Sequence, residues 1–258
     1  NNERERDEWE RKRADPGLRD FLDPAVADTI HDGLDVQFRY GLVRHSAWLD
    51  VPAFLKAQRD RMLVDGTLVE SVFTSNEQPT TNNVILYTTG PFADHPGLVP
   101  VKGELLTVRI PGLKLNAIVS RNAFLLPLGD DRYRLGATFA WNDVWSGPTE
   151  EAKEELLERL SKMLSKTPPP SPWEKGEGDG VVSVLEHVAG VRPASRDRRP
   201  IIGFPQGHAK RTQRSEFIFN GLGSRGVLLA PWCAEHLADH LLNGASLDRE
   251  VDASRFGA

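Results

Sequence analysis

Several features are missing from this sequence of 258 residues, and each absence narrows its function. It has a single cysteine, Cys233, which excludes an internal disulfide bond and any metal site built from several thiolates. No apolar run approaches the roughly 20 residues that cross a bilayer, and the first residues are charged. Positive charge is not in excess, because the formal net charge is −5. We therefore expect a soluble, cytoplasmic protein with no membrane partner, for which nucleic acid is a disfavoured partner.

The N-terminal segment, residues 1–34, is rich in charges of both signs and has no apolar stripe for a core. We expect a solvated helix or frayed segment there and assign it no function. The rest of the chain alternates apolar runs with turn signals, and hydrophobic residues make up 39% of the sequence, enough to fill a sizeable core.

The pattern of apolar residues predicts both helices and strands. One helix follows a capping residue, Asp50, and ends at Gly66; another covers "TEEAKEELLERLSKMLSK"; the last runs from about Val227 and ends at Gly244. Short strands separated by turn signals fill about residues 100–188, which predicts a mainly antiparallel sheet. The fold class is therefore α/β to α+β, with a mixed, largely antiparallel sheet and helices.

A glycine pattern near the end of the chain, Gly221, Gly223 and Gly226, has the spacing GxGxxG between an apolar run and a helical segment. A dinucleotide fold would need a second strand with an acidic residue about 20 positions on, and the sequence after Gly226 has no apolar run for that strand. The glycines either form a structural turn or hold a ligand. The helix that follows favours negative charge at its N-terminus, so the electron-rich edge of a flavin is as suitable a ligand as a phosphate.

Five motifs, in order, resemble the FAD-dependent oxidoreductases of the D-amino acid oxidase and glycine oxidase group. They are "GLVRHSAWLDVPAFLKAQRDRMLVDG", "VILYTTG", "PVKGELL", "AFLLPLGDDRYRLGAT", and "GVRPASRDRRPIIG" followed by "FNGLGSRGVLLAPWCAEHLADHLL". The resemblance implies part of an FAD-binding domain over residues 35–95, a substrate domain over 96–189 and the C-terminal part of the FAD-binding domain over 190–258. It also implies FAD as the cofactor.

The resemblance carries over a set of site residues. Arg192, in "GVRP", matches the arginine that clamps a substrate carboxylate, a task that suits a planar guanidinium; the alternative is an ordinary surface ion pair. The cofactor residues implied are Gly90, Gly221, Gly223, Ser224, Arg225, Gly226 and Val227. We expect the other arginines of this segment to be structural or to face solvent: Arg196, Arg198 and Arg199.

Two further positions are assigned to the catalytic site by the same resemblance. Phe124 stands where many relatives have a tyrosine, and phenylalanine cannot donate a hydrogen bond, so it indicates an apolar pocket or simply a core aromatic residue. Lys102 is expected near flavin N5 or near the substrate, and the alternative is an exposed lysine on a strand. No metal site is expected, because His236 and His240 are four apart without the acidic residue of HExxH; we expect both on a solvated helix face.

The sequence departs from the family at its start, where no apolar strand before Asp35 leads into a glycine turn. We therefore expect an N-terminal FAD-binding segment to be missing, because the chain is a fragment, a degenerate member or one part of a complex. The function implied is oxidation of a small amine or amino acid by hydride transfer to flavin, with an amine or carboxylate as substrate. One alternative is a noncatalytic or partner-completed domain. The other is a tRNA-modifying oxidase, because "GLGSRG" also resembles the C-terminal domain of that enzyme.

Overall fold

The structure is a computed structural model that describes residues 3–23, 34, 41–70, 84–164, 182–204 and 216–256. The chain forms two compact units, one of residues Asn1–Ile30 and Val36–Gln78 and the other of His31–Asp35 and Pro79–Ala258. Residues 41–50, which precede the helix expected after Asp50, form no strand. No helix among the described residues is long and apolar enough to span a bilayer.

The smaller unit contains two helices, α1 (Glu3–Ala14) and α2 (Val51–Val64). Helix α1 buries none of its residues, as its charge pattern predicts, and its Trp9 donates a hydrogen bond to the carbonyl of Asp23 at 3.0 Å. Helix α2 begins where expected, because Asp50 accepts a hydrogen bond from the amide of Ala53.

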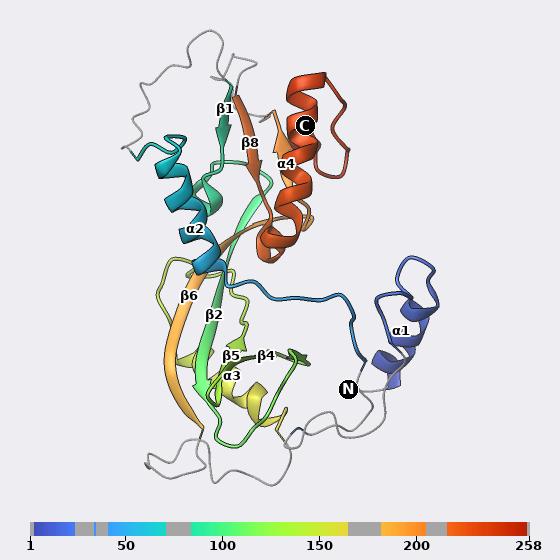
Figure 1. The fold of residues 1–258 in the computed structure, drawn as a ribbon, viewed down its shortest axis with the longest axis vertical. Coiled ribbons are helices and arrows are strands. Elements are labelled where there is room, and N and C mark those ends of the chain that lie inside the picture. Colours follow the sequence, from blue (N-terminus) through green and yellow to red (C-terminus); the bar gives the residue numbers. More distant parts are fainter. Residues whose placement is uncertain are drawn as a thin grey trace. The chain divides into compact units, whose positions relative to one another are not determined.

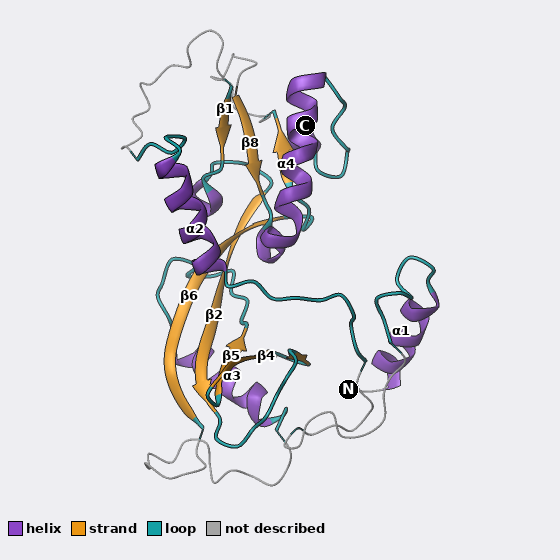
Figure 2. Ribbon diagram, in the orientation of Figure 1, coloured by secondary structure: helices purple, strands orange, loops and turns teal. Residues whose placement is uncertain are grey.

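The larger unit contains two sheets, shown as orange arrows in Figure 2. The five-stranded sheet has the order β3-β4-β5-β2-β6, and all of its pairings are antiparallel. The bounds of its strands are β2 Leu98–Arg109, β3 Val119–Ser120, β4 Phe124–Gly129, β5 Arg132–Gly136 and β6 Ser183–Ser195. This confirms the predicted mixed, largely antiparallel fold, and the domain boundary expected after residue 189 falls within β6.

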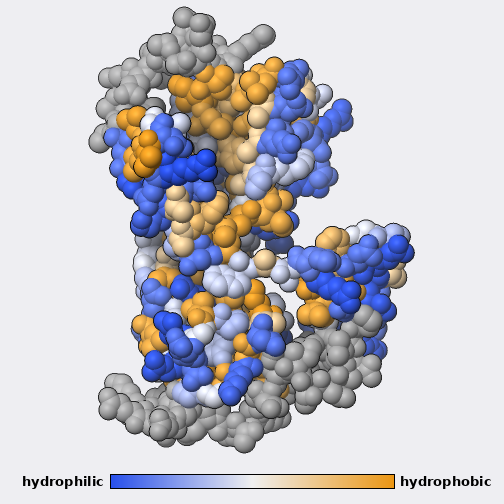
Figure 3. Space-filling model, viewed as in Figure 1, coloured by the Kyte–Doolittle hydropathy of each residue, from blue (hydrophilic) through white to orange (hydrophobic). Residues whose placement is uncertain are grey.

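The three-stranded sheet has the order β1-β8-β7, with β1 parallel to β8 and β7 antiparallel to it. Its elements are β1 Ile85–Tyr87, β7 Ile201–Gly203 and β8 Glu216–Asn220, with the short helices η1 Gly90–Phe92, η2 Gly223–Arg225 and η3 Ala253–Phe256 nearby in the chain. Helix α4 (Gly226–Asn243) packs on this sheet through a core that includes Cys233 and Leu237. Figure 3 shows apolar residues over β1 and β8.

Strands β2 and β6 are the longest pair of the unit and run alongside each other in Figure 1. Their register pairs Val101 with Arg192 and Gly103 with Gly190. Since side chains alternate between the two faces of a strand, Lys102 and Glu104 lie on the face opposite to Val101 and Arg192. One face of the strand pair therefore carries Lys102 and Glu104, and the other carries Arg192.

One face of this strand pair carries a buried polar network next to helix α3 (Glu150–Ser161). Glu104, whose side chain is 1% exposed, lies 2.9 Å from Lys102 Nζ and 2.8 Å from His187 Nε2. It also accepts hydrogen bonds from the amide and hydroxyl of Thr149, the residue that caps α3. Burial raises the pKa of Glu104, but the hydrogen bonds from Lys102 and Thr149 outweigh it, and the pKa is lowered below its ordinary value.

Glu104→Gln is expected to reduce the free energy of unfolding by about 3 to 5 kcal/mol at neutral pH, because it leaves Lys102 buried without a counter-charge. The carboxylate is stabilised in the folded state. Its contribution is thus complete above the unfolded pKa of about 4.5 and is lost as pH falls through the lower folded pKa. Urea unfolding of the wild type and the variant at a series of pH values measures both effects.

The matched control is Glu186→Gln, since Glu186 lies on β6 with a half-exposed side chain that pairs with Arg134 at 3.6 Å. Its effect is expected to be about 1 kcal/mol or less. Equal losses for the two variants would show that the Glu104 network does not hold α3 to the sheet.

Candidate active site

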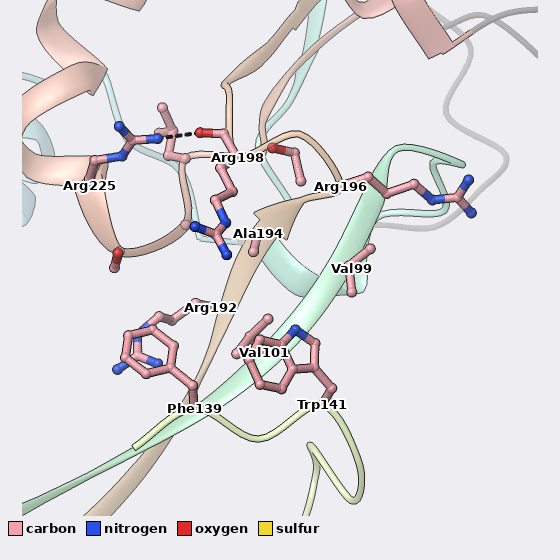
Figure 4. A pocket seen from close by; sticks show the side chains of 14 residues that line it. Val99, Val101, Phe139, Trp141, Arg192, Ala194, Arg196, Arg198 and Arg225 are labelled. Atoms are coloured by element: carbon pink, nitrogen blue, oxygen red, sulfur yellow. Dashed lines mark hydrogen bonds between the residues drawn. The ribbon is translucent and has the colours of Figure 1, made fainter. Parts of the chain in front are cut away.

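The other face of β2 and β6 lines a cavity of about 810 Å³ within the larger unit. Its walls come from β2, β6, the turn after β6, the segment after β5, and the loop between β8 and α4 (Figure 4). The lining residues are Val99, Val101, Phe139, Trp141, Arg192, Ala194, Ser195, Arg196, Arg198, Gly221, Leu222, Gly223, Ser224 and Arg225. This set contains four arginines and no acidic residue, so the cavity favours an anion.

Arg192 lies against the backbone of β2 rather than extending into solvent. A Cβ atom built on Gly103 would lie only 2.0 Å from Arg192 Nη1, so the guanidinium occupies the space that any larger side chain at position 103 would take. Arg192 donates to the carbonyl of Thr138 at 3.3 Å, and its Cζ lies 4.7 Å from the centre of the Phe139 ring. These contacts hold the planar group at one end of the cavity.

The charge of Arg192 has no acidic partner among the residues that the structure describes. Its burial lowers the pKa of the guanidinium from its ordinary value, which is high enough that the group stays charged. A half-buried cation without a counter-ion is costly unless an anion binds beside it. The arrangement therefore fits a carboxylate ligand.

The loop between β8 and α4 supplies backbone donors to the cavity. Gly221 and Gly223 have φ of 71° and 56°, a region that glycine adopts without a steric penalty. The amide of Gly221 donates to its neighbour Asn220, and that of Arg225 to the carbonyl of Leu222. Leu222 forms a β-bridge with Ala194, which places the amide of Gly223 against β6. The amide of Ser224 has no hydrogen-bond partner within the described segments, so it remains available to a ligand at the N-terminus of α4.

Five of the residues assigned from the sequence line this cavity: Arg192, Gly221, Gly223, Ser224 and Arg225. Gly226 and Val227 do not line it, since they begin α4. Gly90 lies outside the lining as well, but its carbonyl accepts a hydrogen bond from Asn220 Nδ2 at 2.8 Å. The buried Asn220 therefore ties the turn after β1 to the glycine loop.

Two catalytic assignments are not brought into the cavity. Lys102 lies on the opposite face, 3% exposed, in the ion pair with Glu104, because its position in β2 is one residue out of phase with Gly103 and Val101. It is thus neither beside the cavity nor an exposed strand lysine. Phe124 is half-buried at the start of β4, opposite Gly136, and packs within the sheet.

The structure also places the remaining residues discussed from the sequence, which are two arginines, two histidines and the cysteine. Arg196 and Arg198 are exposed, as expected, and both also line the cavity. His236 and His240 are not on a fully solvated face, since His236 accepts a hydrogen bond from the amide of Asp248 and His240 Nδ1 lies 2.6 Å from the carbonyl of Ala245. Cys233 is buried, and burial raises the pKa of its thiol.

Two aromatic residues of the cavity, Phe139 and Trp141, were not predicted from the sequence motifs. They are 54% and 62% exposed. The sequence did contain a pattern that could have predicted them. Phe139 and Trp141 are two residues apart in "GATFAW", directly after "GAT", and this spacing places both on the same side of an extended segment. Their rings add an apolar wall beside Arg192.

Comparison with known proteins gives the family. A model described as "DAO: FAD dependent oxidoreductase" matches residues 1–240. The D-amino-acid oxidase of Rubrobacter xylanophilus is 29% identical over 210 residues, which cover 77% of this chain and 58% of that protein. The tRNA 5-methylaminomethyl-2-thiouridine biosynthesis bifunctional protein MnmC of Marinobacter nauticus is 27% identical over 173 residues, 62% of this chain and 25% of that protein.

A solved structure supports the same fold. The iminodiacetate oxidase of Chelativorans sp. superposes with a TM-score of 0.51 at 22% identity, covering 71% of this chain and 48% of that one. The chain thus spans between a quarter and somewhat more than half of the length of these relatives.

Gly103→Ala is expected to displace the Arg192 guanidinium, because the added methyl group would occupy its place against β2. Acetate binding, measured by isothermal titration calorimetry, should weaken about tenfold or more, while urea unfolding changes little because alanine suits a strand backbone.

Gly190→Ala is the matched control, since Gly190 pairs with Gly103 and a Cβ there would meet nothing within 4 Å. It should bind acetate like the wild type. If the two variants bind acetate equally well, Gly103 does not position Arg192.

Proposed function

We propose that this chain, which belongs to the FAD dependent oxidoreductase family, forms the substrate side of a site that oxidises a small amine bearing a carboxylate. The observation that carries the proposal is Arg192, a half-buried cation that lines the cavity and has no acidic partner in the described part of the chain. D-amino-acid oxidase and iminodiacetate oxidase, named for substrates of this chemical kind, are among the similar proteins.

The residues of the glycine loop fit the FAD of this family. The free amide of Ser224 and the positive end of α4 suit the pyrimidine edge of a flavin ring, which becomes more negative on reduction. Arg225, at the same loop, adds a positive charge. FAD, when bound, accepts a hydride from the carbon beside the substrate amine.

The contribution of the chain's own residues is binding and orientation. Arg192 holds the substrate carboxylate, and its contacts with Thr138 and Phe139 fix the plane of the guanidinium. Phe139 and Trp141 shield one side of the cavity from water. Among the described residues that line the cavity there is no histidine, lysine or acidic residue. These side chains therefore supply no general acid or base, and positioning is the catalytic role that remains for them.

A second candidate function, a tRNA-modifying oxidase, is favoured by one specific observation. The cavity combines Arg196, Arg198 and Arg225 with the exposed ring of Trp141, and basic groups beside aromatic rings suit a single-stranded nucleotide. MnmC proteins are among the similar ones. The net charge of −5 opposes this candidate, and a gel shift with bulk tRNA at low salt distinguishes it, since an amine oxidase would leave the RNA unshifted.

Arg192→Lys tests the main proposal in the flavin-loaded protein that contains this chain. Lysine keeps the charge but loses the two-pronged geometry, and hydrogen bonds to charged groups contribute roughly 1.5 to 3 kcal/mol. We expect kcat/KM for carboxylate-bearing amines to fall about ten- to 150-fold. The visible flavin absorbance should be unchanged, because Arg192 acts on the substrate.

The matched control is Arg199→Lys, since Arg199 does not line the cavity and pairs with Glu250 at 3.3 Å. Its kinetics should match the wild type. Unaltered turnover in Arg192→Lys would remove Arg192 from the site, and a protein without flavin absorbance even after addition of FAD would contradict the proposed reaction itself.

A further inference from the structure

A second guanidinium faces the cavity from the side opposite to Arg192. Arg198 belongs to the turn that follows β6, and its side chain points from that turn toward the space above Arg192 (Figure 4). Arg196, two residues earlier, is directed away from this space in the same view. Of the two arginines that this turn adds to the cavity lining, Arg198 is therefore the one directed at a ligand beside Arg192.

The acidic residue next to Arg198 forms an ion pair with a different arginine. Asp197 pairs with Arg255 at 2.8 Å, and it also accepts a hydrogen bond from the amide of Arg199. Burial raises the pKa of Asp197, but the hydrogen bonds from Arg255 and Arg199 lower it below its ordinary value, so the carboxylate stays charged and paired. The guanidinium of Arg198 has no acidic partner among the described residues.

The turn that carries Arg198 is held by several hydrogen bonds. The amide of Arg198 donates to the carbonyl of Ser195 at 3.1 Å, and the Ser195 hydroxyl donates to the carbonyl of Arg199 at 2.6 Å. Arg225, from the glycine loop, donates to the carbonyl of Arg198. The backbone of Arg198, at a φ of 62°, is thus fixed from two sides, so a ligand need not order it.

Between the two guanidinium groups, the floor of the cavity is apolar. Val101 and Ala194 lie there, with Phe139 and Trp141 beside them (Figure 4). Such a surface cannot solvate charge, so charged groups of a ligand are directed to its two ends. The arrangement fits a short molecule with an acid group at each end and an apolar or weakly polar middle.

We propose that Arg198 binds a second acid group, a carboxylate or a phosphate, so that the substrate is an amine with two acid groups, one held by Arg192 and the other by Arg198. This inference rests on the proposed function for the role of Arg192. It adds a specificity-determining residue that the motifs did not indicate, and it narrows the substrate class from monocarboxylates to dianions.

Binding of matched acids to the 258-residue chain tests the inference without flavin or turnover. Isothermal titration calorimetry at low salt compares succinate with butyrate, and glutarate with valerate, each pair having the same carbon chain. We expect at least one diacid to bind about three- to tenfold more tightly than its monoacid partner, a range that allows for the exposure of Arg198. A comparison of 3-phosphonopropionate with succinate shows whether the second site binds a phosphonate, as an analogue of phosphate, or a carboxylate more tightly. Either preference supports the site.

Arg198→Ala should abolish the preference for the diacid while leaving the monoacid affinity unchanged. Arg199→Ala, which removes the same charge from the same turn outside the cavity, should retain the preference. If alanine unfolds the turn, Arg198→Gly serves instead, because glycine accepts the positive φ.

Two results would contradict different parts of the account. Equal affinity for diacids and monoacids across both pairs, or a diacid preference that persists in Arg198→Ala and Arg198→Gly, would overturn the second site and leave Arg192 in place. Monoacid binding that is the same in the wild type and in Arg192→Lys would instead contradict the role of Arg192 in the proposed function.

Discussion

The approach of the Arg192 guanidinium to the backbone of β2 at Gly103 is the contact on which the site depends. It is possible only because the register of β2 and β6 brings these two residues next to each other and because position 103 has no side chain. From that position the cation faces a cavity in which no acidic residue is found among the described lining residues. The strand pair is long and antiparallel, so the backbone of Arg192 is anchored in the sheet, while Thr138 and Phe139 in the segment after β5 contact its guanidinium.

The opposite face of the same strands supports this arrangement. Glu104 pairs with Lys102 and binds the cap of α3, which joins the sheet to its helix through buried charges. A buried ion pair is a weak source of stability, but it specifies register, because a shift of one residue would exchange the two faces. The Glu104 network and the Arg192 cavity therefore both depend on the same pairing of β2 with β6.

Much of the fold could be predicted from local patterns. The caps at Asp50 and Thr149 and the glycine after α4 determine where helices begin and end, and turn signals separate the strands of the sheet. The candidate site was predicted in part, since Arg192 and the glycine loop were found by motif and line one cavity. Lys102 was misplaced because its face depends on the phase of β2, which the motif "PVKGE" does not reveal. Arg198 was set aside because only the folded turn shows that Asp197 pairs with Arg255 instead.

The central claim is that the cavity holds a substrate carboxylate on Arg192 beside a flavin ring at the glycine loop. The most direct measurement is a crystal structure of the flavin-loaded protein with a bound carboxylate inhibitor such as benzoate. The account predicts both carboxylate oxygens on the guanidinium of Arg192, and the pyrimidine edge of the flavin on the amide of Ser224. A carboxylate bound elsewhere, with Arg192 in contact with a protein acid, would contradict it.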